Sequence, residues 1–458
     1  MQTFLNIITW LNENIFWGAP MLALFIGTGV FFSIKLRFFQ FNIVKIFRET
    51  LLSKHEDGEA AQKGQSLSPL QTLTSSLALT IGTGNIIALG TAIALGGAGA
   101  VFWMWLSAFL GMATTYAENF LGMRYRKRNA DGGYSGGAFY YIEKALGNFP
   151  AKAFALCCVF ASIGIGNMTQ VNSMSASMQH SFGTPLWLTG AVALVPIGLL
   201  VFGGAKTFGR VTEKTIPVIS ILYILGCLAV IMLFIGDVPA TLVRICTEAF
   251  GFRAIGGGVA GVGISKAMSW GFRRGIFSNE AGLGSSVTMN SMSSSTDPHK
   301  QSLWATLTVF FDTIVICTLT ALPILLTGAD KAFANSGEMG DMGVNLASLA
   351  FADAFGVYAG MFVTVSVVFF AIATVAGWSL FGSICVRYLF GNRAVKPFLI
   401  AFVVFAFVGA VMRLDLVWGL ADLMNALMAV PNLLAIVLLG LKGEVGTKIH
   451  TKARLSIK

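Results

Sequence analysis

Two polar, glycine-containing segments interrupt long apolar stretches of the chain. The first, Thr80–Asn85, reads Thr-Ile-Gly-Thr-Gly-Asn, and the second, Gly275–Gly282, reads Gly-Ile-Phe-Ser-Asn-Glu-Ala-Gly. Glycine is a poor helix former that exposes its backbone, so both segments are expected to unwind. Freed N–H groups favour anions and freed carbonyl oxygens favour cations, so each interruption predicts a binding site for charged groups.

The two interruptions occupy matching places in the chain. Asn85 is followed by Leu89-Gly90, and Asn279 is followed at the same offsets by Leu283-Gly284, about 195 residues later. The second interruption lies five predicted membrane spans after the first, and an odd number of spans reverses the direction of travel. This arrangement predicts an inverted five-helix repeat whose first helix is discontinuous. The alternative is that these glycines only permit close helix packing.

Composition indicates that the elements positioning these segments are membrane-spanning helices. Of 458 residues, 55% are hydrophobic and 11% are charged, against about 25% charged in soluble domains. Mean hydropathy is +0.75 over the whole chain. The net charge of +10 does not indicate a nucleic-acid partner, because the basic residues fall in alternate short loops.

The apolar stretches predict about eleven transmembrane helices in an all-α polytopic membrane protein. A leading span is expected near Trp17–Ile34, and ten more near 72–97, 100–123, 153–178, 186–203, 214–236, 256–284, 303–327, 358–389, 396–412 and 416–441. A short helix is expected within a loop at Gly343–Phe355. The predicted organisation is an extra N-terminal helix (1–34), a cytoplasmic loop (35–68), the first repeat (69–236), the second repeat (256–441) and a basic cytoplasmic tail (442–458).

The distribution of lysine and arginine predicts the orientation, since cytoplasmic loops retain positive charge. Basic residues are dense between Lys35 and Ser68, at Arg124–Arg128 and in the tail, whereas the opposite side has only Arg244, Arg253, Lys331 and Arg413. The bias predicts a multi-pass protein of the cell (inner or plasma) membrane, with the N-terminus outside and the C-terminus in the cytoplasm.

Around both interruptions the sequence resembles the alanine or glycine:cation symporter family. The motifs that agree, in order, are Thr80–Gly97, Phe102–Trp105, Gly136–Gly147, Gly275–Ser285, Phe311–Thr313, Gly377–Ser379 and Asn425–Asn432. The resemblance extends over nearly the whole chain. It implies a leucine-transporter-like fold with one extra N-terminal helix, and import of a small neutral amino acid, alanine or glycine, together with sodium.

A zwitterionic substrate needs partners for its carboxylate and ammonium and a pocket for its side chain. Backbone N–H groups freed over Gly82, Thr83, Gly84 and Asn85 are the predicted carboxylate site, and Asn279 is its counterpart in the second interruption. The predicted aromatic walls are Phe277 and Trp378, with the alternative that both are ordinary packing residues. Thr374 lies one turn before Trp378 and is expected to face the same cavity.

Sodium, the expected coupling ion, prefers hard oxygen ligands. The candidates are carbonyl groups near Ile81 and Gly84 and the side-chain oxygens of Thr374 and Asp312. A carboxylate at bilayer depth is costly and is by default functional. Asp312 could therefore balance sodium or the substrate ammonium, or pair structurally with one of the basic residues in the seventh predicted span, Lys266, Arg273 and Arg274.

The remaining polar groups favour other roles. Glu280 is expected to form a gating salt bridge with Arg273 or Arg274, and Glu118 is expected to be solvated near the end of a span. All four histidines are interpreted as solvated surface residues: His55, His180, His299 and His450. No cofactor other than the coupling ion is expected.

Other classes of function fit less well. An intramembrane hydrolase needs a nucleophile with a positioned base, and no histidine is predicted in mid-membrane. A channel usually repeats short subunits around an axis, whereas this chain carries two internal halves. Within transporters, glutamine or serine is the alternative substrate, and the sequence does not distinguish sodium from proton coupling.

Overall fold

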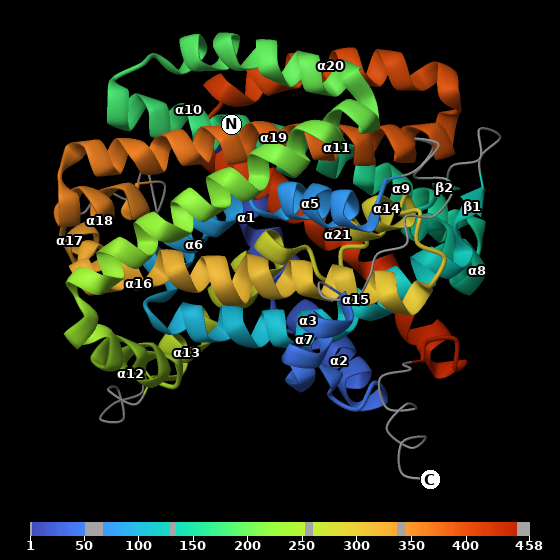
Figure 1. The fold of residues 1–458 in the computed structure, drawn as a ribbon, viewed down its shortest axis with the longest axis horizontal. Helices are drawn as coiled ribbons and strands as arrows, with labels where there is room; N and C mark the ends of the chain where they lie inside the picture. Colours follow the sequence, from blue (N-terminus) through green and yellow to red (C-terminus); the bar gives the residue numbers. More distant parts are fainter. Residues whose placement is uncertain (1, 51–66, 129–133, 252–259, 337–344, 447–458) are drawn as a thin grey trace.

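Helices dominate the computed structural model, which describes residues 2–50, 67–128, 134–251, 260–336 and 345–446 (Figure 1). In these ranges two short strands, β1 (Lys127–Arg128) and β2 (Tyr134–Ser135), pair antiparallel. The helices of the first part are α1 (Gln2–Leu11), α2 (Ala19–Lys35), α3 (Ile43–Thr50), α5 (Pro69–Thr80), α6 (Leu89–Gly96), α7 (Gly99–Tyr125), α8 (Ala138–Leu146), α9 (Asn148–Ile163), α10 (Thr169–Phe182), α11 (Leu186–Leu233) and α12 (Val238–Ala249). Those of the second part are α13 (Ala260–Asn279), α14 (Ser286–Ser291), α15 (Pro298–Val309), α16 (Thr318–Thr327), α17 (Ala329–Ser336), α18 (Leu346–Phe355), α19 (Val357–Phe390), α20 (Val395–Val411) and α21 (Leu414–Leu441).

The most buried part of the fold lies around α7, which packs against α13 and α15. Small residues allow this close approach. A Cβ atom at Gly275 of α13 would lie 2.3 Å from Ser107 Oγ of α7, and one at Gly271 would lie 2.5 Å from the Ala100 carbonyl oxygen. Close packing at small residues is a common source of helix association in membranes.

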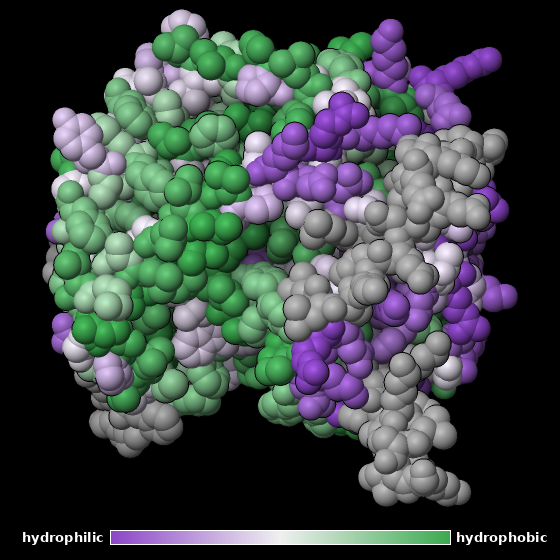
Figure 2. All heavy atoms as spheres, viewed as in Figure 1, coloured by the Kyte–Doolittle hydropathy of each residue, from purple (hydrophilic) through white to green (hydrophobic). Residues whose placement is uncertain are grey.

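The outer helices carry apolar side chains on their exposed faces. On α11, Leu199 and Val195 are 71% and 65% exposed, and on α20 Val404 is 56% exposed. Figure 2 shows an apolar surface over the left and central parts of one face, with hydrophilic side chains at its right end. A helix that is apolar on its outward face suits contact with lipid.

Two unusual helices, α11 and α13, affect the count of membrane spans. Seven described helices are long and apolar enough to cross a membrane, or up to nine if each of two bent helix pairs is one span. Helix α11 covers the two predicted spans 186–203 and 214–236, and its backbone leaves helical geometry at Gly204 (φ 71°). Eleven spans would require that α11 divide at Gly204 and that α13, with its three basic residues, also cross; that count stays a prediction. The short helix expected at Gly343–Phe355 is observed as α18.

The N-terminal helices contact the N-terminal part of α21. The pair Asn6–Phe16 and Ala19–Lys35 is bent by 42°. Asn12 Nδ2 donates to the carbonyl oxygen of Gly419 at 2.8 Å, and Trp17 Nε1 donates to that of Asp422 at 3.0 Å. Phe25 of α2 stacks with Trp17 and lies beside Gly282, where a Cβ would approach its ring to 2.8 Å.

The loops assigned to opposite sides lie at opposite ends of the molecule. Helix α8 and strands β1 and β2, on the basic side, lie at the right in Figure 1, whereas α12, α17 and α18 lie at the left. The expected loop 35–68 is partly described, as α3 and its flanks. The tail 442–458 is described to residue 446, and Lys54, Lys63, Arg253, His55 and His450 lie outside the described residues.

This arrangement predicts which positions a membrane-impermeant reagent can reach. The exposed Cys246 on α12 is first replaced by serine, since it would react itself. With Lys331→Cys on α17, we expect maleimide labelling in intact cells. With Lys144→Cys on α8, we expect labelling only after permeabilisation. Labelling of Lys144→Cys in intact cells would reverse the assigned orientation.

Candidate functional site

The first interruption follows α5. Helix α5 begins with a capping box between Ser68 and Gln71 and ends at Thr80, after which Ile81 is extended (ψ 92°). A π-helical segment, η3 (Gly84–Ala88), then leads into α6. The axes of residues 71–80 and 84–96 differ by 46°. The predicted break therefore exists, and π-helical turns of this kind are frequent at functional sites.

Side-chain oxygens accept hydrogen bonds from the freed backbone N–H groups of this break. The Gly82 N–H donates to Asn85 Oδ1 at 3.0 Å. The Thr83 N–H and hydroxyl both donate to Gln170 Oε1, at 3.2 and 2.9 Å. Thr374 Oγ1 donates to the carbonyl of Ala78 at 3.0 Å. Two of the backbone N–H groups predicted to bind the substrate carboxylate thus donate to neutral side-chain amide oxygens in this conformation.

The two glycines of the break have different surroundings. A Cβ at Gly82 would lie 2.6 Å from Oγ1 of the predicted binding residue Thr374 and 3.1 Å from Oε1 of Gln170, which sequence reasoning missed. A Cβ at Gly84 would lie 3.2 Å from Ser278 Cα. Gly84 therefore serves the close approach of η3 to α13, which favours the packing alternative at that position.

A buried polar cluster joins the first break to α13 and to η6, the π-helical segment Phe310–Cys317. Asp312, fully buried, accepts from Asn85 Nδ2 at 2.7 Å, from Ser278 Oγ at 2.8 Å and from Thr313 Oγ1 at 2.8 Å. Asn279 extends the cluster by donating to Thr313 Oγ1 at 3.2 Å. The structure thus brings together Asn85, Asn279 and Asp312, which are far apart in sequence. Ser278 and Thr313 are members that sequence reasoning missed.

The expected pairing of Asp312 with a basic residue does not occur. Both Arg273 and Arg274 bind Asp422 of α21: Arg273 through Nε at 2.9 Å and also through Nη2, and Arg274 through Nη1 at 3.2 Å. The exposed Lys266 lies at the start of the described part of α13. Among the described residues, then, the Asp312 carboxylate is met by neutral donors only. Asp422 was not expected, although a carboxylate in an apolar span was a signal that pointed to it.

The second interruption lies slightly later than its motif indicates. Helix α13 continues to Asn279, and the unwound residues are Glu280–Ser285. Positive φ values at Glu280 (57°), Gly282 (90°) and Gly284 (73°) turn the chain before α14. For a non-glycine residue such as Glu280 this conformation is uncommon and persists only when its surroundings enforce it.

Two expectations about glutamates near this break are wrong. Glu280 does not pair with an arginine; its carboxylate accepts from Ser285 Oγ and also interacts with Trp378. Glu118 is not solvated but fully buried, and it accepts from the Gly284 N–H at 3.1 Å and from Asn432 Nδ2. Both carboxylates therefore hold the unwound backbone instead of facing water.

A third interruption, which sequence reasoning missed, lies between α9 and α10. The π-helical segment η4 (Gly164–Met168) has Gly166 directly against the Trp378 ring, where a Cβ would approach Cγ to 2.1 Å. Gln170 follows it and reaches the first break. The run Gly164-Ile165-Gly166-Asn167 carries the same mixture of glycine and polar residues as the other two breaks, so the same criterion would have found it.

The two predicted aromatic walls lie in different places. Trp378 is 1% exposed and packs on Gly166 and, edge to face, on Phe381. Phe277 stacks on Trp418 of α21 at 4.8 Å, beside the Arg274 guanidinium. Trp378 thus borders the breaks, whereas Phe277 belongs to the cluster around Asp422.

The histidine interpretation needs one correction. His299 is buried, and its Nδ1 lies 2.6 Å from the Tyr116 hydroxyl, whereas His180 is exposed. Among the described residues no group of three histidine, cysteine, aspartate or glutamate side chains is placed to hold a metal ion.

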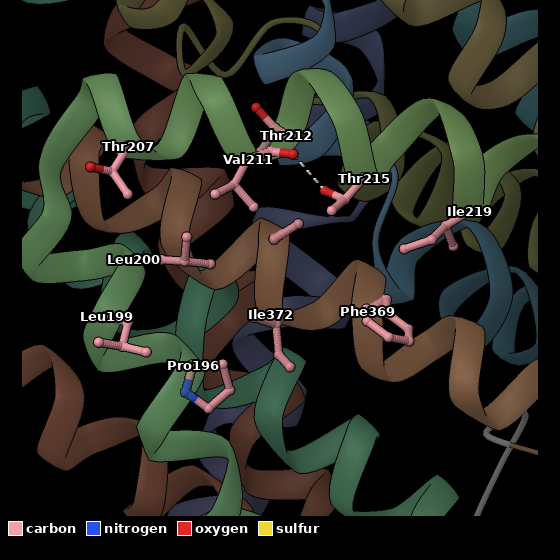
Figure 3. Close-up of a pocket in the computed structure, with 11 residues that line it drawn as sticks. Pro196, Leu199, Leu200, Thr207, Val211, Thr212, Thr215, Ile219, Phe369 and Ile372 are labelled. Atoms are coloured by element: carbon pink, nitrogen blue, oxygen red, sulfur yellow. Dashed lines mark hydrogen bonds between the residues drawn. The ribbon is translucent and has the colours of Figure 1, made fainter.

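The cavity in Figure 3 is separate from these breaks. It has a volume of about 370 Å³ and lies between the two limbs of α11 and helix α19. Its lining is largely apolar, and the Thr215 hydroxyl there is bonded to the Val211 carbonyl at 2.9 Å. Leu199 and Phe369, both on its wall, are 71% and 51% exposed. The cavity is therefore a fissure in the apolar outer surface.

Helices interrupted around a buried polar centre define this protein as a multi-pass membrane transporter, and comparison with known proteins identifies its family. A profile of the sodium:alanine symporter family matches residues 1–452. The sodium/alanine symporter AgcS of Methanococcus maripaludis is 39% identical over 441 residues, which are 95% of each chain. The probable sodium/glutamine symporter GlnT of Bacillus subtilis is 32% identical over 461 residues, covering 99% of this chain and 92% of that protein. The chain belongs to the sodium:alanine symporter family, whose members are transporters and not enzymes.

Among solved structures, the fold is similar to that of a Na⁺-coupled sialic acid symporter in a substrate-bound, outward-open state. The TM-score is 0.53 at 11% identity, and the match covers 86% of this chain and 82% of that one. At this identity the likeness concerns the fold alone.

The buried ion pair at Asp422 predicts a large difference between two aspartates on the same helix. Asp422→Asn leaves two buried guanidinium groups without a carboxylate, and loss of about 3–5 kcal/mol of stability is expected. The control, Asp415→Asn, breaks an exposed pair with Arg413 and is expected to cost less than about 1 kcal/mol. Thermal unfolding in detergent compares them; equal losses would contradict the buried pairing.

Proposed function

We propose that this protein is a sodium-coupled symporter that imports a small neutral amino acid, alanine or glycine, by alternating access. The observation that carries the proposal is the buried Asp312 cluster. It joins the first break, α13 and η6 through hydrogen bonds to Asn85, Ser278 and Thr313. A carboxylate in this setting, with neutral donors around it, favours a cation that enters and leaves during transport.

The proposed sodium ligands fall into two groups of contacts. Asp312 contributes carboxylate oxygens next to the Ser278 and Thr313 hydroxyls, all hard donors of the type that sodium prefers. Thr374 lies apart from them, beside Gly82 and the Ala78 carbonyl. The extended residue Ile81 directly precedes Gly82 in the chain. Gly84 lies nearer to the Asp312 group, through its contact with Ser278. Two places for cations, one on each side of the first break, are therefore consistent with the donor chemistry.

The substrate is proposed to bind at the first break, with its carboxylate toward the amides of Gly82 and Thr83. To receive it, Asn85 and Gln170 would exchange their present hydrogen bonds for the substrate. The tight contact of Gly166 with Trp378 leaves little room for a long side chain, which favours alanine or glycine. Glutamine, the substrate named for GlnT of Bacillus subtilis, or serine is the alternative.

The proposed mechanism is alternating access by an inverted five-helix repeat in the cell membrane. The breaks at Ile81–Gly82 and Glu280–Ser285 lie five predicted spans apart, one in each proposed half. Helices α13 and α21 are linked by the ion pairs of Arg273 and Arg274 with Asp422. A rocking motion of the two halves would break and re-form these ion pairs. The N-terminus is proposed to lie outside and the C-terminus in the cytoplasm.

Asp312→Asn removes the charge and keeps the shape. If Asp312 serves sodium, the sodium concentration for half-maximal alanine uptake should rise about tenfold or more, as expected for loss of a charged interaction of about 1.5–3 kcal/mol. Uptake is measured in proteoliposomes and normalised to folded protein, with the exposed Asp353→Asn as control. If alanine affinity falls first at unchanged sodium dependence, the charge serves the ammonium. If uptake depends on the sodium and alanine concentrations as in the wild type, Asp312 is not part of the binding site.

Trp378→Ala opens space beside the first break and tests the selectivity. We expect weaker alanine uptake and stronger competition by glutamine, because the small pocket loses its aromatic wall. The control is Trp187→Ala, a side chain 58% exposed on α11. Competition by alanine, serine and glutamine is measured per folded molecule. If the three amino acids compete in the same order in both variants, Trp378 is an ordinary packing residue and does not set the selectivity.

A further inference from the structure

Glu118, in the last third of α7, has unequal surroundings at its two carboxyl oxygens. Oε1 accepts the Gly284 N–H at 3.1 Å and the Asn432 side-chain amide. Oε2 is buried and has no hydrogen-bond partner among the described residues. An ionised carboxylate needs hydrogen-bond donors at both oxygens when it is buried, and in the described part of the chain only Oε1 has them.

The groups that face Glu118 leave its charge uncompensated. The second break presents Glu280 and the Gly282 amide, α8 presents Tyr141, and α21 presents Asn432. Arg273 and Arg274 of α13 are bound to Asp422, Lys266 of the same helix is exposed, and no described salt bridge includes Glu118. An ionised Glu118 would thus lie near a second buried carboxylate and away from any described cation, which is unfavourable in a dry interior.

A metal cation fits this place poorly. The neighbouring oxygens already accept hydrogen bonds: Gly282 O from Asn432 Nδ2 at 2.9 Å, and Asn432 Oδ1 from the Tyr141 hydroxyl at 2.5 Å. Donors, not lone pairs, point toward Oε1. Sodium needs several free oxygen ligands, whereas a proton needs only Oε2.

We propose that Glu118 is a proton-binding site, protonated in this conformation and deprotonated when the second break rearranges during transport. The inference rests on the proposed symport function and adds a proton to its cycle. Protonated Glu118 holds the turn Gly282–Gly284 through Oε1 and Asn432. Loss of the proton places a charge beside Glu280 and favours a conformation in which the break opens to water.

The sign of the pH dependence follows from this state. The closed conformation binds the proton, so raising the pH disfavours it, and sodium-dependent alanine uptake should fall as the pH rises, by at most about tenfold per pH unit for one proton. Glu118→Gln stays neutral at every pH and keeps an acceptor and the side-chain size. Its uptake should lose this pH dependence.

The experiment uses the full chain in proteoliposomes with a pH-sensitive dye in the lumen. In the wild type, alanine uptake driven by sodium should be accompanied by a change in lumenal pH. In Glu118→Gln, whatever sodium-dependent uptake remains per folded molecule should have a flat pH profile and give no dye signal. The matched control is Glu143→Gln, an exposed carboxylate at the end of α8, which should behave as the wild type.

The outcomes separate the two proposals. If the wild type takes up alanine with sodium but shows neither pH dependence nor a dye signal, the proton site is overturned while the symport stands, and this holds even if Glu118→Gln fails to fold. A dye signal and pH profile unchanged in well-folded Glu118→Gln also overturn it. If the wild type takes up no amino acid with sodium, the proposed function itself fails.

Discussion

The lack of water in the bilayer interior constrains every interruption in this fold. A backbone amide freed inside a membrane must find a partner in the protein itself. Here the partners are side chains from distant helices: Asn85 and Gln170 at the first break, and Glu118 and Asn432 around the second. The same side chains that make the breaks possible therefore also link them to α7, α10 and α21, so a change at one break is transmitted to the helices that support it.

Much of this arrangement could be predicted because it depends on local chemistry. Glycine beside polar residues at bilayer depth identified both breaks, and a carboxylate in an apolar span identified Asp312. In the structure, Asn85 of the first break donates a hydrogen bond to Asp312. The resemblance to a transporter family was also confirmed over residues 1–452.

What could not be predicted depends on pairing between distant segments. Arg273 and Arg274 are close in sequence to Glu280, and nothing local indicated that Asp422, 149 residues from Arg273, would bind both. Glu118 lay close enough to a predicted span end to suggest solvation, yet α7 is enclosed by α13, α14 and α15. Phe277 and Trp378 share a residue class and a motif context, but their helix faces point to different neighbours. Each error came from inferring a partner from proximity along the chain.

The contacts of the N-terminal helices with α21 have a mechanical consequence. Asn12 and Trp17 bind the backbone carbonyls of Gly419 and Asp422, and Phe25 lies against Gly282 of the second break. The N-terminal helices thus contact α21 and also the second break, which directly follows α13. If α21 tilts, the first helices must either move with it or lose the hydrogen bonds that Asn12 and Trp17 donate to it. In the proposed alternating-access cycle, the helices at the start of the chain would therefore limit how far the N-terminal end of α21 can move.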